Sequence, residues 1–432
     1  MTAEIAILNS NAVALAADSA VTIGREAAKV YTSADKLFQM SNKGPVGIMF
    51  YQRPYFLGVP WETVVKCYRT ELGNKTFPRL ADYLEDFIRF VKRSRQMFPR
   101  KHQRDGVRTI ILSFFHFVRE KFKEMTTHEY DQSRKMTEIE VKQLFADLAR
   151  EELQKTKEYP KLQGMSANVI NTIKKEYERD IAPIQRTVFE DLPMTPSTKR
   201  HLKEIAFELI TSNRLLQSEQ YTGLVVAGFG EKEHFPRLVE RVLFGMAANH
   251  PLYMAASQAS IENDGEAILV PLAQKEMVIT FMDGIDPDLN SLFVRSMKQV
   301  FTGLTEAIFT EIKKKYPKYG ANLERGVKKN LDTLESNLYN EWEKVRIDEY
   351  RNPVMKMVAS LPKDELGSMA ESLVNLTKFK RRISTQQETV GGPIDVAVIT
   401  KGDGFVWTKR KHYFKPELNP RYITRITRGD TL

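Results

Sequence analysis

The chain has 432 residues, of which 42% are hydrophobic and 28% are charged, as in ordinary globular proteins. Its single cysteine, Cys67, excludes an internal disulfide framework and fits a reducing compartment. The net charge is +10, and the basic residues are densest between Lys92 and Arg108. No nucleic-acid-binding motif accompanies them, so the cluster favours a solvated helix end and loop over a nucleic-acid surface.

Residues 1–20 lack the basic start and the uninterrupted apolar core of a signal peptide. The longest strongly apolar run, residues 109–118, contains Ser113 and His116 and is too short to cross a bilayer. We therefore expect a cytoplasmic protein that does not enter a membrane.

The chain opens with strands. Residues 3–8 and 13–17 are short apolar runs separated by a turn cluster at residues 9–11, which predicts a hairpin that starts almost at the first residue. Two further strands are predicted at residues 36–40 and 46–51.

From residue 61 the apolar residues recur with a helical period. Thr137 and Glu140 have the spacing of a capping box, and Ser166 and Ser197 are placed to cap later helices. The predicted helices are 61–72, 78–98, 107–125, 137–157, 166–184 and 197–214.

Strands are predicted again after this helical stretch, and more helices follow. A Gly-Asp-Gly turn at residues 402–404 lies between two apolar runs, which is a clear β-hairpin signal. The predicted strands are 223–229, a strand around 241–244, 267–281, 394–400 and 405–409, and the predicted helices are 289–315, 323–351 and 363–378.

This order of strands, helices, strands, helices and strands predicts an α+β layered domain. Two sheets built of hairpins, with helices on their outer faces, satisfy it.

The second residue is a candidate nucleophile. A methionine followed by a small residue such as Thr2 is usually removed, which leaves a free α-amino group on the threonine. That amine can take the proton from the threonine hydroxyl, because its ordinary pKa of about 7.7–8.0 lies near working pH. A lysine ammonium nearby would lower the pKa of the amine, and a carboxylate would hold the lysine in place. Lys36 and Asp18 are candidates for these roles.

Thr2 and the segment Ala16-Ala17-Asp18-Ser19-Ala20-Val21-Thr22 resemble the opening of proteasome β-subunits and of the bacterial heat-shock peptidase that pairs with an unfoldase ring. In those N-terminal-nucleophile (Ntn) hydrolases an aspartate follows the nucleophilic threonine by sixteen residues, as Asp18 follows Thr2. A lysine then precedes an apolar strand, as Lys36 does here. Near the end of the chain, Gly391-Gly392 and the hairpin after them resemble the closing Gly-Gly and hairpin of the family.

The resemblance implies a four-layer αββα Ntn-hydrolase sandwich with large helical insertions. It divides the chain into the first half of the core, a helical insertion, the strands and helix of the second sheet, a helical extension, a closing hairpin and an irregular tail. In that order the segments are 1–98, 99–219, 220–316, 317–385, 386–415 and 416–432.

Carried over residue by residue, the resemblance makes Thr2 the nucleophile and general base, Lys36 the group that tunes its amine, and Asp18 the group that orients Lys36. The backbone of Thr22 would pair with an extended substrate. Val21 and Met49 would lie near the pocket for the side chain before the cut, and a backbone N–H near Tyr51 would meet the oxyanion.

The implied function is a threonine-type peptidase that acts on peptides or unfolded proteins. It would assemble with copies of itself, and the resemblance allows an ATP-dependent unfoldase as a further partner. The seven histidines are scattered without metal-ligand spacing, so we expect no metal and no cofactor, and nucleic acid is not an expected partner.

Three departures from the family pattern keep other interpretations open. Phe50-Tyr51-Gln52 replaces the Ala-Gly-Gly of the family, and an auxiliary Asp-x-x-Ser is missing at residues 387–390. The auxiliary serine at the head of a later family helix has no match at residues 282–286, where Asp283 or Asp286 could substitute. The main alternative is a catalytically inactive Ntn-fold protein that assembles or binds. A weaker alternative is a basic nucleic-acid-associated protein.

Overall fold

The structure, a computed structural model, describes residues 3–23, 29–130, 136–218, 220–316, 320–384, 390–412 and 414–427. The chain forms two compact units. The first contains Met1–Ser33, Ile261–Val398 and Val406–Leu432, and the second contains Ala34–Ser260 and Ile399–Phe405.

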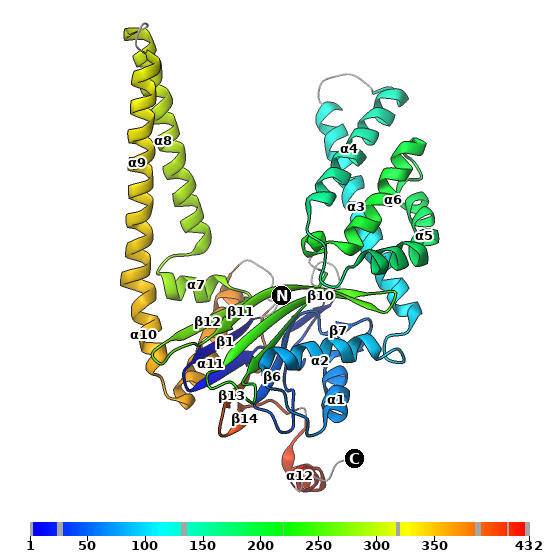
Figure 1. The fold of residues 1–432 in the computed structure, drawn as a ribbon, viewed down its shortest axis with the longest axis vertical. Helices are drawn as coiled ribbons and strands as arrows, with labels where there is room; N and C mark the ends of the chain where they lie inside the picture. The colour runs from blue at the N-terminus through cyan, green and yellow to red at the C-terminus, as the bar shows by residue number, and fades with distance from the viewer. Residues whose placement is uncertain are drawn as a thin grey trace. The chain divides into compact units, whose positions relative to one another are not determined.

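A five-stranded sheet with the order β12-β1-β2-β13-β14 forms the centre of the first unit (Figure 1). Every residue of β1 and β2 is buried, which explains their nearly continuous apolar sequences. The strands are β1 (Ala3–Asn9), β2 (Ala12–Ala17), β12 (Ala267–Ala273), β13 (Asp395–Thr400) and β14 (Gly404–Lys409).

The turn between β1 and β2 confirms the predicted hairpin and has a clear physical cause. The side-chain oxygen of Asn9 accepts the N–H groups of Asn11 and Ala12, each at 3.1 Å, which is the asparagine-based turn expected from the sequence. The amide nitrogen of Asn9 donates to the carbonyls of Val358 and Leu361 at 3.2 and 2.9 Å. One buried side chain therefore shapes the turn and fixes the nearby helix end.

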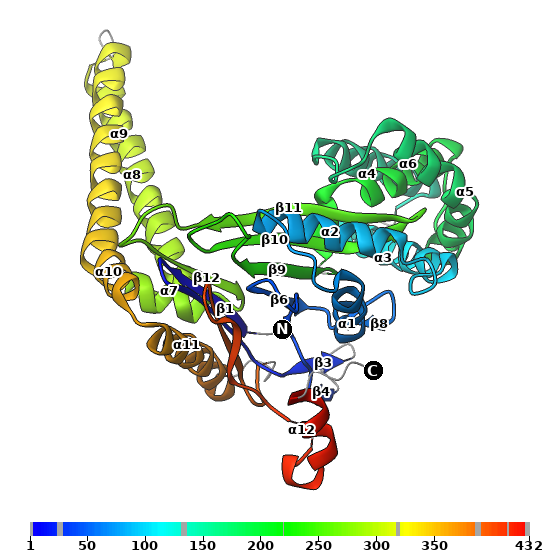
Figure 2. The ribbon, with the colours of Figure 1, turned by 60° about the horizontal axis from the view of Figure 1, so that its bottom comes forward.

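Helices cover one face of this sheet. Ile5, Ala14 and Val396 of the strands share an apolar core with Leu366 and Leu373. The helices are α7 (Glu276–Asp283), α10 (Asn352–Ser360) and α11 (Lys363–Ile383). The pair α8 (Pro287–Lys315) and α9 (Gly320–Val345) lies side by side and leads through a π-helical turn, Arg346–Arg351, into α10 (Figures 1 and 2).

The second unit contains the other five-stranded sheet, in the order β11-β10-β9-β6-β5. Ile48, Phe50 and Leu224 of this sheet pack against Trp61 and Phe87, and the rings of Phe50 and Trp61 stack 4.4 Å apart. The elements are β5 (Leu37–Gln39), β6 (Val46–Gln52), β9 (Thr222–Gly228), β10 (Arg237–Ala247), β11 (His250–Ser260), α1 (Trp61–Leu72) and α2 (Leu80–Arg93).

A four-helix body in the same unit packs on β10 and β11. Its apolar core includes Phe115, Phe145 and Phe189 of the helices together with Phe244 and Leu252 of the strands. The helices are α3 (Arg100–Tyr130), α4 (Glu138–Glu158), α5 (Ala167–Phe189) and α6 (Pro196–Thr211), followed by a short 3-10 helix, Asn213–Ser218.

The smaller elements are two-stranded sheets and a helix near the end of the chain. They are β3 (Val21–Ile23) with β4 (Lys29–Tyr31), β7 (Tyr55–Phe56) with β8 (Val59–Pro60), a 3-10 turn at Pro416–Leu418 and α12 (Pro420–Thr427). The chain is thus a mixed α and β protein with antiparallel sheets. In the described parts of the chain, no helix has the length and apolar character needed to cross a membrane.

Several predicted elements are confirmed. Helix α1 has its predicted bounds, and the capping box before α4 is present, with Thr137 accepting the Glu140 N–H and Glu140 accepting the Thr137 N–H. Ser166 caps α5, whereas α6 is capped by Thr195, two residues before the predicted Ser197.

Strand β11 was not predicted, and its turn explains the omission. The turn residues Ala248 and Asn249 both have positive φ, 52° and 61°, as a type I′ hairpin turn requires. Glycine usually marks such turns in a sequence, and here neither turn residue is glycine.

The predicted strand 267–281 is wrong in its second half, which forms α7. Val278, Ile279 and Phe281 favour a strand by propensity, but burial of Val278 in the core of the first unit favours the helix. Gly284, in the left-handed region at φ 70°, ends the helix by donating its N–H to the Thr280 carbonyl. The tail 416–432, predicted to be irregular, contains α12.

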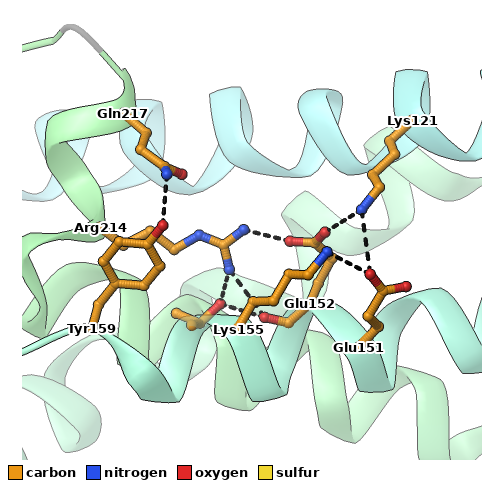
Figure 3. A network of polar contacts seen from close by, with 8 residues as sticks. Lys121, Glu151, Glu152, Lys155, Tyr159, Arg214 and Gln217 are labelled. Carbon is orange, nitrogen blue, oxygen red and sulfur yellow. Dashed lines mark hydrogen bonds and ion pairs between the residues drawn. The ribbon is translucent and has the colours of Figure 1, made fainter. Parts of the chain in front are cut away.

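A buried ion-pair network stabilises the four-helix body (Figure 3). The Glu152 side chain, 2% exposed, accepts hydrogen bonds from Arg214 and from Lys121, the latter at 2.7 Å. Arg214, whose side chain is 5% exposed, also donates to the Glu152 carbonyl at 3.0 Å. Burial acts to raise the pKa of Glu152, but the hydrogen bonds from Lys121 and Arg214 outweigh it and the pKa is lowered.

Replacing Arg214 with methionine should destabilise the protein by about 3 kcal/mol, because it leaves the buried Glu152 carboxylate without its main partner. Urea unfolding followed by circular dichroism measures this. Lys203→Met, which removes the exposed pair of Lys203 with Glu178, is the matched control and should cost less than about 1 kcal/mol.

The same network makes stability depend on pH. The pKa of Glu152 is lowered in the folded state. The ionised carboxylate therefore adds to the free energy of unfolding at pH values above the ordinary glutamate pKa, and this stabilisation is lost as the pH falls through the folded-state pKa. The advantage of the wild type over Glu152→Gln should therefore shrink as the pH falls from 7 to 3. An advantage that did not change with pH would contradict this assignment.

Candidate functional site

Asp18, which directly follows β2, joins the start of β1 to the Gly-Gly segment near the end of the chain. Its Oδ1 accepts the N–H of Ala3 at 3.1 Å, and its own N–H donates to the Ala3 carbonyl at 3.1 Å. Its Oδ2 accepts the N–H groups of Ala20 and Gly391 at 3.2 and 2.9 Å. The carboxylate is buried, 1% exposed, and these backbone donors satisfy it.

The neighbouring Ser19 adds two more bonds to the same junction. Its N–H donates to the Gly391 carbonyl at 3.1 Å, and its hydroxyl donates to the Pro393 carbonyl at 2.6 Å. The Ala-Ala-Asp-Ser segment and the Gly-Gly segment, predicted from opposite ends of the chain, are thus in direct contact.

Gly392 is the position in this junction that requires glycine. Its φ of 75° lies in the left-handed region, and a Cβ there would approach the Thr32 carbonyl oxygen to 2.7 Å. Lys378 of α11 donates to the Gly392 carbonyl at 3.0 Å.

The junction fixes the start of β1. Ala3 is held by both the backbone and the side chain of Asp18. The preceding residue, Thr2, lies outside the described residues, as do residues 387–389 of the auxiliary segment.

Lys36 belongs to the second unit, where it immediately precedes β5. It is buried, 4% exposed, and its carbonyl accepts the N–H of Phe50 of β6 at 2.9 Å. A buried lysine requires a polar or charged partner.

Met49 and Tyr51 lie on β6, beside β5. Their neighbours Ile48 and Phe50 belong to the core shared with α1 and α2, so alternation places Met49 and Tyr51 on the other face of the sheet. Both are buried, Met49 completely.

The Tyr51 ring lies against Gly223, its partner on β9. A Cβ on Gly223 would lie 1.9 Å from ring carbons of Tyr51. The Tyr51 hydroxyl donates to the carboxylate of Glu240 on β10, which also accepts the hydroxyl of Ser257 on β11. The tyrosine that replaces glycine in the family pattern is therefore fixed at both ends.

Val21 and Thr22 form β3, which pairs with β4 in the first unit. Val21 pairs with Tyr31 and Thr22 with Val30. The predicted substrate-pairing strand is therefore extended, as strand addition requires.

The buried carboxylate Glu240 was missed by the sequence reasoning. The available signal was a charged residue at an alternating position inside the apolar run from Leu238 to Phe244. Glu4 gives the same signal in β1, where it is 2% exposed.

Much of the basic cluster is engaged in ion pairs. Arg100 pairs with Glu176, and Arg104 and Arg108 both pair with the buried Asp180 of α5. These arginines hold α3 against α5. Among the residues described, no group of histidine, cysteine and acidic side chains is arranged to hold a metal ion.

Comparisons with known proteins do not assign the chain to a family. No protein-family model matches the sequence, and no curated protein does. Among solved structures, a mutant of Anbu from Hyphomicrobium sp. strain MC1 is similar over 99% of this chain and 96% of that chain, with 9% identity and a TM-score of 0.29. A similarity this distant carries no argument about function.

Asp18→Asn should destabilise the protein by about 2 kcal/mol, because an NH₂ group replaces one acceptor oxygen and leaves at least one buried N–H unpaired. Chemical unfolding measures the loss. Asp332→Asn, an exposed residue of α9, is the matched control and should change stability by less than about 0.5 kcal/mol. Equal effects would show that the junction is not as described.

Gly223→Ala should destabilise by about 3 kcal/mol, because the new methyl group overlaps the Tyr51 ring. The same change in a Tyr51→Ala background should cost much less, and this coupling in a double-mutant cycle is the measurement. Gly326→Ala, at an exposed helical glycine with open space around it, should be neutral or slightly stabilising. If the losses of stability from Gly223→Ala and Tyr51→Ala simply added in the double variant, the contact between the two residues would be contradicted.

Proposed function

We propose that this chain is a proteasome-like threonine hydrolase that cleaves peptide bonds, with Thr2 as the N-terminal nucleophile once Met1 is removed. Asp18, Lys36 and the β6 backbone near Tyr51 would complete its active site.

The observation that carries this proposal is the Asp18 junction. A threonine at the start of β1 acts as a nucleophile only if its amine and hydroxyl are held in one place. Asp18 binds Ala3, the residue directly after Thr2, and ties it to Gly391. The contact between the two motif segments supports their common role at one site.

Strand alternation supports the orientation of Thr2. Ala3, Ile5 and Ile7 of β1 belong to the core that includes α11 residues. Thr2 would therefore point to the opposite face, the one that carries Glu4.

In the proposed reaction, the Thr2 hydroxyl oxygen attacks the carbonyl carbon of the scissile peptide bond and its proton passes to the Thr2 α-amino group. The tetrahedral oxyanion is met by a backbone N–H near Tyr51. Collapse breaks the C–N bond, the leaving amine takes the proton, and an ester to Thr2 remains. Water, activated by the same amine, hydrolyses that ester and restores the threonine.

Lys36 would sit beside the Thr2 amine and lower its pKa, so that more of the amine is neutral and able to act as a base. Asp18 would orient the Lys36 ammonium. The backbone of Thr22 would pair with an extended substrate, and Val21 and Met49 would border the pocket for the side chain before the cut.

A four-layer αββα sandwich would place these groups together. In one unit α11 and its neighbours pack on one face of the sheet, and in the other unit α1 and α2 do so, as outer helix layers would. The four-helix body packs on β10 and β11 in addition.

The proposed substrate is a peptide or an unfolded protein segment. We also propose self-assembly, because peptidases of this kind are usually enclosed by their own copies. An ATP-dependent unfoldase would be a partner that delivers unfolded substrates. The proposal involves no cofactor, membrane or nucleic acid, and the proposed location is the cytoplasm.

One observation favours a second candidate, a catalytically inactive protein that keeps the fold for assembly or binding. The Tyr51 ring occupies the strand position where the family pattern has glycine, and it is fixed by Gly223 and Glu240. A side chain there narrows the space for an extended substrate.

The test is covalent labelling by an electrophile directed at N-terminal threonine, followed by peptide mass mapping. The wild type should lose Met1 and carry one adduct on Thr2. Thr2→Ala should carry none, and Lys36→Ala should react about 100-fold more slowly, because its amine is more often protonated. Lys43→Ala, which changes an exposed lysine in the same unit, should react at the wild-type rate.

Retention of Met1 would exclude the hydrolase, because the Thr2 amine would then be acylated. Loss of Met1 without labelling, in a protein that unfolds cooperatively, would favour the inactive alternative.

A further inference from the structure

The helical pair α8 and α9 has almost no core of its own. In α8, 29 residues long, Met297 is the one buried residue, and none of the described side chains from residue 324 to 345 in α9 is buried. Helices of this length depend on packing of an apolar face for most of their stability. The pair therefore exposes apolar side chains that packing against a partner would bury.

On α8 this surface is a continuous stripe. At 100° per residue, five exposed side chains fall within about 120° of the helix surface. The charged residues of this stretch, Arg295, Lys298 and Glu306, lie outside that arc. The stripe consists of Leu289, Leu292, Phe293, Val300 and Leu304, which are 39–59% exposed.

A second stripe on α9 lies on the same side of the pair. It consists of Leu334, Leu338 and Val345, 47–56% exposed. On each helix we compare the stripe with the side that faces the other helix. Viewed from the N-terminus of its own helix, each stripe is rotated about the helix axis in the same direction away from that side. In an antiparallel pair this places both stripes on one face, which we call the hairpin face.

The base of the pair is firmly attached to the first unit. Asp283 at the end of α7, 3% exposed, accepts hydrogen bonds from Arg346 and Arg351 at 2.7–2.9 Å. The hairpin face is thus presented by a fixed element.

Four of the five stripe residues of α8 are arranged symmetrically about one point, which points to a second copy of the same chain. Leu289 and Leu304 have their midpoint between Ser296 and Met297, and Phe293 and Val300 have the same midpoint. A two-fold axis through that point would place Leu289 on the partner's Leu304 and Phe293 on the partner's Val300.

The midpoint of the α9 stripe lies at the same position along the helical pair as the midpoint of the α8 stripe. Its end members Leu334 and Val345 have their midpoint between residues 339 and 340. The Phe293 and Trp342 rings are 4.5 Å apart, and counting from them sets the α8 midpoint level with residues 338–339. Counting along the antiparallel helices from the Lys313–Glu324 ion pair places the α8 midpoint level with residues 340–341 of α9. Counting from the hydrogen bond between Trp342 and Asn290 sets the α8 midpoint level with residues 335–336. The α9 midpoint lies within the range that the three contacts give, so one two-fold axis can pass through both helices.

We infer that two copies of this chain associate through their hairpin faces into an antiparallel four-helix bundle. At 1.5 Å per residue the stripes span about 23 Å on α8 and about 17 Å on α9, and at about 10 Å per helix the face covers about 400 Å². That is about half of what each partner contributes to a typical stable interface, so the dimer is a weak one that forms at high protein concentration. The inference names a surface for the proposed self-assembly but does not depend on catalysis.

The first experiment places a cysteine at the proposed axis of the full-length chain. In a Cys67→Ser background, Ser296→Cys should form a disulfide-linked dimer on mild oxidation, because the two residues meet across the axis. Lys298→Cys, half a helical turn away on the opposite side, is the matched control and should remain unlinked. Equal linkage of both variants, or of neither, would overturn the inference.

The second experiment measures mass by light scattering across a concentration series. The wild type should reach at least twice the chain mass of 49.8 kDa. Val300→Glu should raise the dimer dissociation constant by about 100-fold, because each copy loses an apolar contact and buries a charge. Lys298→Glu, with its charge change outside the stripe, should leave it unchanged.

A monomeric wild type would overturn the inference, as would an assembly that Val300→Glu leaves intact. Neither result would bear on Thr2, since labelling of the nucleophile is measured separately.

Discussion

The proposed site depends on how the buried carboxylate of Asp18 is satisfied. Its acceptor oxygens bind N–H groups of the first strand, of the segment after the second strand and of the Gly-Gly segment near the end of the chain. A charge buried this deeply is tolerated only with such donors. The requirement to satisfy this carboxylate holds together two segments 373 residues apart and fixes Ala3 at the start of β1.

The residues that form this junction were predictable because local chemistry selects them. Asn9 makes the first turn, an all-buried hairpin follows, and Gly392 occupies a conformation that favours glycine. The resemblance to Ntn hydrolases used the same residues. Their contact could not be deduced from spacing alone, because it depends on long-range packing of β13 beside β2.

Other features were missed where tertiary packing overrides local preference. Val278 and Phe281 favour a strand but belong to α7, because the core of the first unit accepts Val278 from a helix. Strand β11 follows a turn of Ala248 and Asn249 that lacks the usual glycine. Glu240 was overlooked because its hydrogen bond to Tyr51 joins β6 to β10, far apart in the sequence.

The central claim is that Thr2 acts with Lys36. The measurement that tests it most directly is the distance from Thr2 Oγ to Lys36 Nζ in a crystal structure of the mature protein. The account predicts a separation within hydrogen-bond reach, about 3 Å, with the α-amino group of Thr2 free. A separation beyond about 6 Å, where the ammonium no longer influences the amine strongly, would contradict it.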